Sequence, residues 1–366
     1  MTNQPFDYDG LDSVSVSENA AGLTEIMSRL NKKRVCFFLG AGFSKAWNES
    51  YPLSNEIFSI SNKESEKNKE KYGFFSLFES LNFVWGDESS NNEDKAKIFK
   101  NFKFTMDVYR RYPSLLPEHV DKQTVDIFEK QIKTYIKNKF VDEFIDNTEF
   151  QLDHDEFTKE QLDIINFFKK LIIASKLNVI TTNYDITIDK VLHNASPSKN
   201  ILRGFPVHFN GKMQCPKKGG IGLYKLNGGF EVVSQDGLFK IDYDSMNNDE
   251  VSPNIILPSN DQDYSDKYFK SMFIKSSNQL RNSDILVFVG YSFPQEDHII
   301  QFLLKTFTDN DNHNKEVIII DRDEENSHQC YKNAQGVFKD LHEKDGLYYF
   351  KGSFLDVVSA ISTEPA

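Results

Sequence analysis

Five short apolar runs, each followed by glycine or small polar residues, constrain the fold of this chain more than any other feature. Their polar ends are Gly40-Ala-Gly42-Phe-Ser44, Thr181-Thr-Asn-Tyr-Asp185, Asn227-Gly-Gly229, Gly290-Tyr-Ser292 and Asp321. Short apolar runs bounded by such residues are typical of strands that are buried on both faces. Because ligands bind at the carboxyl ends of the strands in an open parallel sheet, we expect the five ends to converge on one crevice.

Helix-like stretches alternate with these runs, which favours an α/β fold. The expected strands are 34–39, 178–181, 223–226, 284–289 and 316–320, and the expected helices are 20–30, 161–176, 266–281 and 296–306. We predict a doubly wound, Rossmann-like and mostly parallel sheet, with 316–320 as its last strand. Residues 230–262 are rich in turn-forming residues, and we expect them to be irregular.

Residues 62–160 have a different character. The stretch 61–70 is highly charged and indicates a loop or an exposed helix face. Apolar residues then recur at helical spacing: Val125, Phe128, Ile132, Tyr135, Ile136, Phe140 and Phe144. We therefore divide the chain into an N-terminal tail and helix (1–32), an α/β core (33–61 and 161–366) and a helical insertion (62–160). The insertion is interpreted as a packed subdomain, although its long helix also offers a surface for oligomerisation.

Composition excludes several classes of protein. The 366 residues contain no apolar run long enough to span a bilayer, and the polar, acidic start lacks the features of a signal peptide, so we expect a cytoplasmic protein. Three cysteines form neither a disulfide framework nor a four-cysteine zinc site, and we expect Cys36 to be buried. The net charge of −12 argues against broad nucleic-acid binding, and the basic stretch 212–218 is interpreted as a solvated loop.

Each polar end has an ordinary structural explanation when it is taken alone. Gly40-Ala-Gly42 can bring backbone N–H groups against a pyrophosphate, but without a third glycine it also fits a simple strand-to-helix turn. Ser44 can bind a phosphate or cap a helix. Asp321 suits a pair of ribose hydroxyls, yet an aspartate after a strand is also common in turns.

Taken together and in order, the motifs resemble the sirtuin-like NAD-hydrolase domains of bacterial antiphage defence. The resemblance rests on Gly40-Ala-Gly-Phe-Ser44, Thr181-Thr-Asn-Tyr-Asp185, Tyr224-Lys-Leu-Asn-Gly228 and Gly290-Tyr-Ser-Phe293 with Asp297. It covers about residues 33–60 and 175–325, whereas 62–160 matches only as the usual place of a variable helical insertion. The resemblance implies a sirtuin-like core that takes NAD as its substrate and needs no metal.

The resemblance also implies roles for individual residues. Its glycine-rich block places Gly40, Ala41, Gly42, Phe43 and Ser44 against the NAD phosphates and the neighbouring ribose. Asn183, beside Thr182, is expected to hold the nicotinamide ribose and a water. Asp185 would orient Asn183 or contact nicotinamide, and helix capping explains it equally well. Gly290 and Ser292 are expected beside the adenosine half of NAD, and Asp321 at the adenine ribose.

The third motif departs from the family. Related domains carry Lys-Leu-His-Gly, with histidine as general base, where this chain has Lys225-Leu-Asn227-Gly. An amide cannot take up a proton near neutral pH, although Asn227 can still bond a ribose hydroxyl. The natural protein is then weak or inactive, or a histidine was replaced to trap substrate, or another group such as His208 serves. His208 is otherwise interpreted as a surface-loop histidine.

The resemblance leaves three alternatives to autonomous NAD cleavage. A protein deacylase is disfavoured, because conventional sirtuins of that kind use four zinc-binding cysteines. A non-catalytic NAD-binding or structural subunit of a defence complex is compatible with Asn227. Cleavage could also depend on a partner, and the family suggests a homo-oligomer that works with a HerA-type ring ATPase or another defence protein. We expect no direct binding to nucleic acid or membrane.

Overall fold

The computed structural model describes the whole chain except residues 1–19, 119, 145–151, 153–155, 199, 206, 210–211, 215–218, 236, 295–296, 310–314, 323–327, 345 and 363–366. The tail, Cys215 and part of the basic stretch 212–218 therefore lie outside the described residues. The predicted N-terminal helix is present as α1 (Ala20–Leu30).

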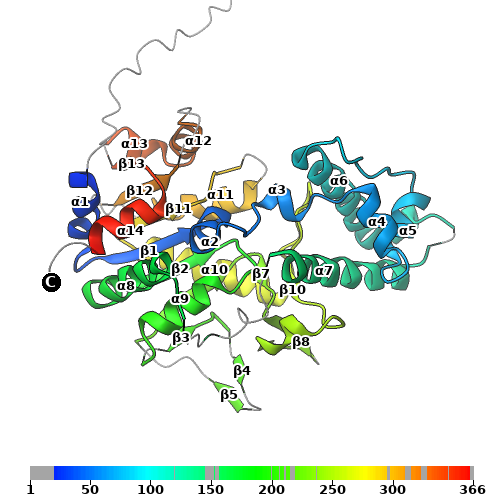
Figure 1. Cartoon of the computed structure of the whole chain (residues 1–366), viewed down its shortest axis with the longest axis horizontal. Helices are drawn as coiled ribbons and strands as arrows, with labels where there is room; N and C mark the ends of the chain where they lie inside the picture. Colours follow the sequence, from blue (N-terminus) through cyan, green and yellow to red (C-terminus); the bar gives the residue numbers. More distant parts are fainter. Residues whose placement is uncertain are drawn as a thin grey trace, which may run out of the picture.

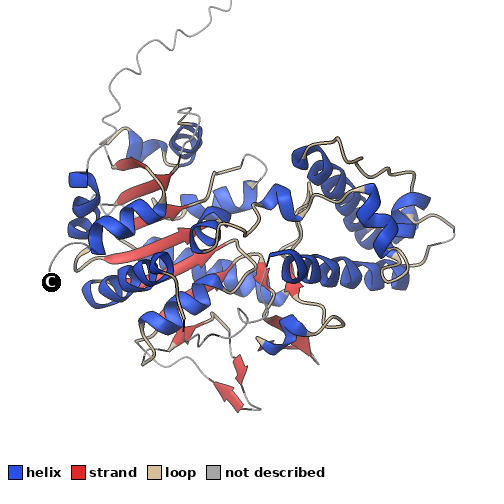
Figure 2. Cartoon of the chain, viewed as in Figure 1, coloured by secondary structure: helices blue, strands red, loops and turns tan. Residues whose placement is uncertain are grey.

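A seven-stranded parallel sheet forms the centre of the molecule (Figures 1 and 2). Its order is β13 (Leu347–Lys351), β12 (Glu316–Asp321), β11 (Ile285–Val289), β1 (Arg34–Leu39), β2 (Lys176–Thr181), β6 (Ile221–Lys225) and β3 (Ile201–Leu202). Every neighbouring pair is parallel. From β6 to β13 this is the strand order of a doubly wound Rossmann-type sheet, with its switch point between β1 and β11. The predicted fold class is confirmed.

Helices cover both faces of this sheet, which explains why its strands are apolar without alternation. In β1, Val35, Phe37 and Leu39 face one hydrophobic cluster, while Cys36 and Phe38 face the other. The first face is covered by α1, α2 (Ala41–Trp47), α8 (Lys159–Ala174), α9 (Thr187–Ala195) and α14 (Phe354–Ser362). The second is covered by α10 (Lys267–Asn282), α11 (His298–Lys305), α12 (Gln329–Val337) and α13 (Lys339–His342). Cys36 is buried, as expected.

Two sequence-based expectations about strands were wrong. The segment 230–262 contains β8 (Val232–Gln235), β9 (Leu238–Ile241), η2 (Asp244–Asn247) and β10 (Asn254–Ile255). β8 and β9 form an antiparallel hairpin in a small sheet with β4 (Val207–Phe209) and β5 (Lys212–Gln214), and β10 pairs with β7 (Gly228–Gly229). In addition, β13 lies outside β12 at the edge of the main sheet, so 316–320 is not the last strand.

Between α3 (Ser54–Ile57) and α8 the described chain is helical and lies at one end of the molecule (Figure 1). It contains α4 (Asn62–Asn68), α5 (Phe74–Ser80), α6 (Asn92–Arg111), η1 (Pro113–Leu115) and α7 (Lys122–Phe144). The charged stretch is a helix, α4, which Ser61 caps. The predicted long helix is α7. Aromatic contacts such as Phe58 with Phe99 and Phe140 with Phe230 join this region to the core.

Candidate functional site

The five polar ends lie at one edge of the main sheet. Each follows the carboxyl end of β1, β2, β6, β11 or β12, and these five strands are consecutive neighbours in a parallel sheet. The ends of β1 and β11 flank the topological switch point, where open α/β sheets bind their ligands. The fold therefore places the five ends along one edge of the sheet, as the sequence predicted, and their convergence on one crevice stays a prediction.

The turns after β1 and β11 touch each other through their backbones. The Gly42 N–H donates to the Gly290 carbonyl at 3.1 Å. A Cβ atom on Gly40 would lie 2.4 Å from that carbonyl oxygen, and one on Gly42 would lie 2.7 Å from the Gly290 Cα. Gly290 itself has φ +63°, a conformation that favours glycine. The glycines at the switch point are thus required by close packing of the two turns. The Ala41 N–H takes no part in the hydrogen bonds between these turns.

Asn183 is fixed by a short chain of hydrogen bonds to the first turn. Its Nδ2 group donates to the Gly40 carbonyl at 2.8 Å and to Ser44 Oγ at 2.9 Å. Ser44 Oγ in turn donates to the Asp185 carboxylate at 2.8 Å. Asp185 also accepts the backbone N–H of Thr187 at the start of α9. Both donors of the Asn183 amide are engaged, so its carbonyl oxygen is the atom left to accept a bond from a ligand or water.

This arrangement assigns definite places to Ser44 and Asp185. Ser44 lies within α2 and does not cap it, because Gly40 holds the N-cap position. Both residues are buried, and Asp185 reaches Asn183 through Ser44 rather than directly. Asp185 also stabilises the first turn of α9, so the two explanations weighed for it are compatible.

Asn227 lies beside the second motif and contacts a tyrosine from a distant segment. Its Nδ2 donates to the Thr182 carbonyl at 3.4 Å, and its Oδ1 accepts the Tyr264 hydroxyl at 2.9 Å. Burial raises the pKa of Tyr264, and the negative charge of Asp297 raises it further. The phenol therefore remains protonated at neutral pH and can donate. The carboxylate of Asp297 accepts a bond from the Tyr291 hydroxyl at 2.9 Å.

A buried network of charged side chains connects the second and third motifs. The Lys225 ammonium group, fully buried, lies 2.9 Å from Asp189 and 2.8 Å from Glu231, and it donates to the Asp185 carbonyl at 2.7 Å. Arg203 is paired with the same two carboxylates. Two cations thus balance two anions. Lys225 connects the third motif, on its own strand, to the second motif through the Asp185 backbone.

The remaining predicted residues are more dispersed. The Phe43 ring is buried in the core against Phe168 and Phe354, so only its backbone is available to a ligand. Ser292 is exposed, and its carbonyl accepts from Asn333 at 3.1 Å. Asp321 ends β12 two strands away from β1. His208 lies in β4 of the small sheet, not at the carboxyl edge of the main sheet.

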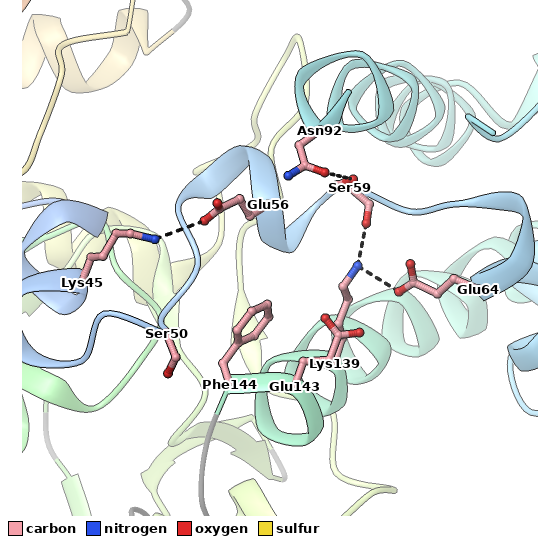
Figure 3. Close-up of a pocket in the computed structure, with 9 residues that line it drawn as sticks. All are labelled: Lys45, Ser50, Glu56, Ser59, Glu64, Asn92, Lys139, Glu143 and Phe144. Atoms are coloured by element: carbon pink, nitrogen blue, oxygen red, sulfur yellow. Dashed lines mark hydrogen bonds and ion pairs between the residues drawn. The ribbon is translucent and has the colours of Figure 1, made fainter. Parts of the chain in front are cut away.

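A separate cavity lies where α2 and α3 meet the helical region (Figure 3). It has a volume of about 340 Å³, and its lining includes none of the predicted site residues. Lys139 crosses it, donating to the Ser59 carbonyl at 2.6 Å and pairing with Glu64 at 2.9 Å. These contacts hold α7 against the segment that leads into α4.

Sequence reasoning missed Tyr264 and the roles of Lys225, Arg203, Asp189 and Glu231. Lys225 stands inside a recognised motif, but nothing in the sequence shows that its ammonium is buried. Tyr264 lies 37 residues from Asn227 along the chain, between the segment 230–262 and the helix predicted from residue 266, where no motif was recognised. No cluster of three or more metal-ligating side chains occurs in the part of the chain that the structure describes.

Comparison with known proteins agrees with the motifs. Residues 177–342 match the family model of the SIR2-like domain. This span contains the second, third and fourth motifs and Asp321, but not the turn after β1. No protein of curated function matches the sequence. Among the described helices of this chain, none is long and apolar enough to cross a membrane.

Several solved structures of Sir2 proteins resemble the chain, with low sequence identity and low TM-scores. One concerns the mechanism and regulation of Sir2 enzymes; it has 12% identity and a TM-score of 0.41, with 93% of this chain and 94% of that chain covered. Another concerns sirtuin substrate affinity, with 11% identity, a TM-score of 0.43 and coverage of 93% and 98%. A third is a Sir2 homologue complex with 2'-O-acetyl ADP ribose, at 10% identity and a TM-score of 0.41, covering 92% and 96%. The fold assignment rests on the strand order described above.

Proposed function

We propose that this protein binds NAD at the carboxyl edge of its sheet and cleaves the bond between nicotinamide and ribose, releasing nicotinamide and ADP-ribose. One observation carries the proposal. Four motifs that resemble those of sirtuin-like domains lie along the carboxyl edge of the sheet, and there Asn183 is held by Gly40 and Ser44 with its carbonyl oxygen left to accept. The match to the SIR2-like domain over residues 177–342 supports it.

The chemistry suits residues of this kind. Loss of nicotinamide leaves a ribose with oxocarbenium character, and the cationic leaving group departs as a neutral molecule. The protein therefore has to orient the substrate, stabilise developing positive charge and deliver a water. The Asn183 carbonyl oxygen is a suitable acceptor for a ribose hydroxyl or that water, and Asn227 is a suitable contact for a second hydroxyl. No step in this scheme requires a metal.

Asn227 favours one second candidate, an NAD-binding subunit that does not turn over. Its side chain cannot act as a general base, and its amide is already bonded to Tyr264 and Thr182. Under either alternative, we further propose a cytoplasmic defence role in antiphage systems, with loss of cellular NAD as the effect of an active form. The same family resemblance suggests a homo-oligomer and a HerA-type ATPase or another defence protein as partners.

The test measures NAD binding by calorimetry and nicotinamide release for the unsubstituted chain, Asn227→His and Asn183→Ala. We expect all but Asn183→Ala to bind, and Asn227→His to release nicotinamide faster than the unsubstituted chain. Asn282→Ala, on the exposed face of α10, is the matched control and should behave as the unsubstituted chain. If the unsubstituted chain binds but no version releases nicotinamide, even with candidate partners added, the non-catalytic candidate is correct. Absence of NAD binding in every version would refute both.

A further inference from the structure

A later segment of the chain holds Asn227 by two hydrogen bonds and pairs with the two residues that follow it. We call residues 245–264 the strap. Its strand β10 pairs with β7, directly after Asn227, and the Ile256 N–H donates to the Asn227 carbonyl at 2.9 Å. Near its end, Tyr264 donates to Asn227 Oδ1 at 2.9 Å, the shorter of two contacts, because its hydroxyl also lies 3.1 Å from Gln262 Oε1. Both the backbone and the side chain of Asn227 therefore depend on where the strap lies.

The Tyr264 ring is held from the other side by α10. It packs edge-on against Phe273, with 4.7 Å between ring centroids, and against Phe269 at 6.3 Å. With its oxygen bonded to Tyr264, the Asn227 amide turns its Nδ2 group toward the Thr182 carbonyl. Removal of the phenol hydroxyl would leave that amide free to rotate, since the Thr182 bond is long at 3.4 Å.

The first half of the strap is hydrogen-bonded to side chains of α7. The Lys137 ammonium donates to the carbonyl oxygens of Ser245 at 3.1 Å, Asn248 at 2.5 Å and Val251 at 2.9 Å. Lys137 is fully buried, so these three carbonyls take the place of water around its charge. Asn138, the next residue of α7, donates to the Asp249 carbonyl at 3.3 Å.

The second half is held by α6. Asn260 donates to Asn101 at 3.3 Å, and Asp261 is paired with Arg111. Two consecutive strap residues are thus fixed to α6, and Tyr264 follows three residues after the second of them.

We propose that Tyr264 is a positioning residue of the nucleotide site and that α6 and α7 set its place, and so the orientation of Asn227, through the strap. The proposal rests on the function proposed above. The helical region then controls the site without contributing a ligand to it. Any change that shifts α6 or α7 against the core alters Asn227 first.

The test combines a local change and a remote change. Tyr264→Phe removes only the hydroxyl, and we expect NAD binding or nicotinamide release to fall about five- to tenfold, the effect of one lost hydrogen bond. In an Asn227→Ala background the same substitution should have no further effect, because the group through which it acts is gone. Equal effects in both backgrounds would show a merely structural role and overturn the assignment.

The remote change is Arg111→Ala, which releases Asp261. Its matched control is Arg281→Ala, which breaks an ion pair of similar exposure with Asp309, away from the strap. We expect Arg111→Ala, but not Arg281→Ala, to speed hydrogen exchange at Ile256 and to weaken NAD binding about two- to threefold. Swapping the charges, Arg111→Asp with Asp261→Arg, should restore both. Equal exchange at Ile256 in the two single variants refutes the coupling, and this readout stands even if no version binds NAD.

Discussion

The buried charge network offers the sharpest prediction for stability, through the variant Lys225→Met. Lys225 contributes one of two cations that neutralise Asp189 and Glu231, and its side chain is fully buried. Methionine keeps the apolar length of the side chain but removes the charge and the bond to the Asp185 carbonyl. The variant leaves two carboxylates facing Arg203 alone, which is one uncompensated negative charge in the interior.

Removing one partner from a buried ionic group costs about 3–5 kcal/mol, because the remaining charge stays desolvated. Domains are commonly stable by about 5–15 kcal/mol, so a large part of the free energy of unfolding would be lost. Restoring neutrality should recover much of it. We therefore expect Lys225→Met combined with Glu231→Gln to be more stable than Lys225→Met alone, although it carries one more substitution.

The measurement is the urea midpoint at neutral pH, followed by circular dichroism. Lys240→Met is the control, because Lys240 pairs with Asp242 at 2.7 Å at a partly exposed site, and pairs in contact with solvent are worth about 0–1 kcal/mol. A loss below about 1 kcal/mol for Lys225→Met, or a double variant less stable than the single one, would contradict the reasoning. NAD binding by Lys225→Met should also weaken, since Lys225 anchors the motif that carries Asn183.

Two further predictions concern close packing and pH. Gly42→Ala would place a Cβ atom 2.7 Å from the Gly290 Cα, so we expect it to lower the free energy of unfolding by more than about 2 kcal/mol. The control is Gly336→Ala on α12, where a Cβ atom meets open space, and it should raise the free energy of unfolding by about 0.5–1 kcal/mol. Thermal unfolding of both variants measures the difference. Burial opposes the charged form of Glu129, yet the cations around it, Lys103 foremost, lower its pKa to about 2. Its stabilising contribution is complete above the unfolded pKa of 4.5 and is lost as pH falls toward 2, so Glu129→Gln should flatten the acid side of the stability profile measured by urea unfolding.

The sequence predicted five of the seven strands of the main sheet, because these are mostly apolar runs that end in a turn signal. The same rule failed at the two edge strands: β3 is only two residues long, and the β13 run Leu347-Tyr-Tyr-Phe-Lys351 is mixed in polarity. It also failed at the hairpin of β8 and β9. There an Asp-Gly pair between two short apolar stretches was an available signal.

The candidate site also contains residues that the sequence could predict and residues that it could not. Residues that follow strands, such as Asn183 and Gly290, could be predicted because the topology of a parallel sheet brings strand ends together. The assignments of roles to these residues remain predictions. Tyr264 could not be found, because its contact with Asn227 depends on how a helical region packs against the core. Such packing is decided by many weak contacts between residues distant in sequence, and no local pattern records it.

The neighbours of Asn227 bear on why this chain has asparagine where related domains have histidine. A histidine that serves as a base needs a free nitrogen directed at the substrate, whereas Asn227 is bonded by Tyr264 on one side and by Thr182 on the other. Both bonds engage the amide, one as acceptor and one as donor. A neutral imidazole has one donor and one acceptor nitrogen, so it would keep both bonds only with neither nitrogen directed at the substrate. Asn227→His therefore gains a base only by giving up the bond to Tyr264 or the bond to Thr182. The present surroundings satisfy both groups of an amide, which favours a natural asparagine at this position.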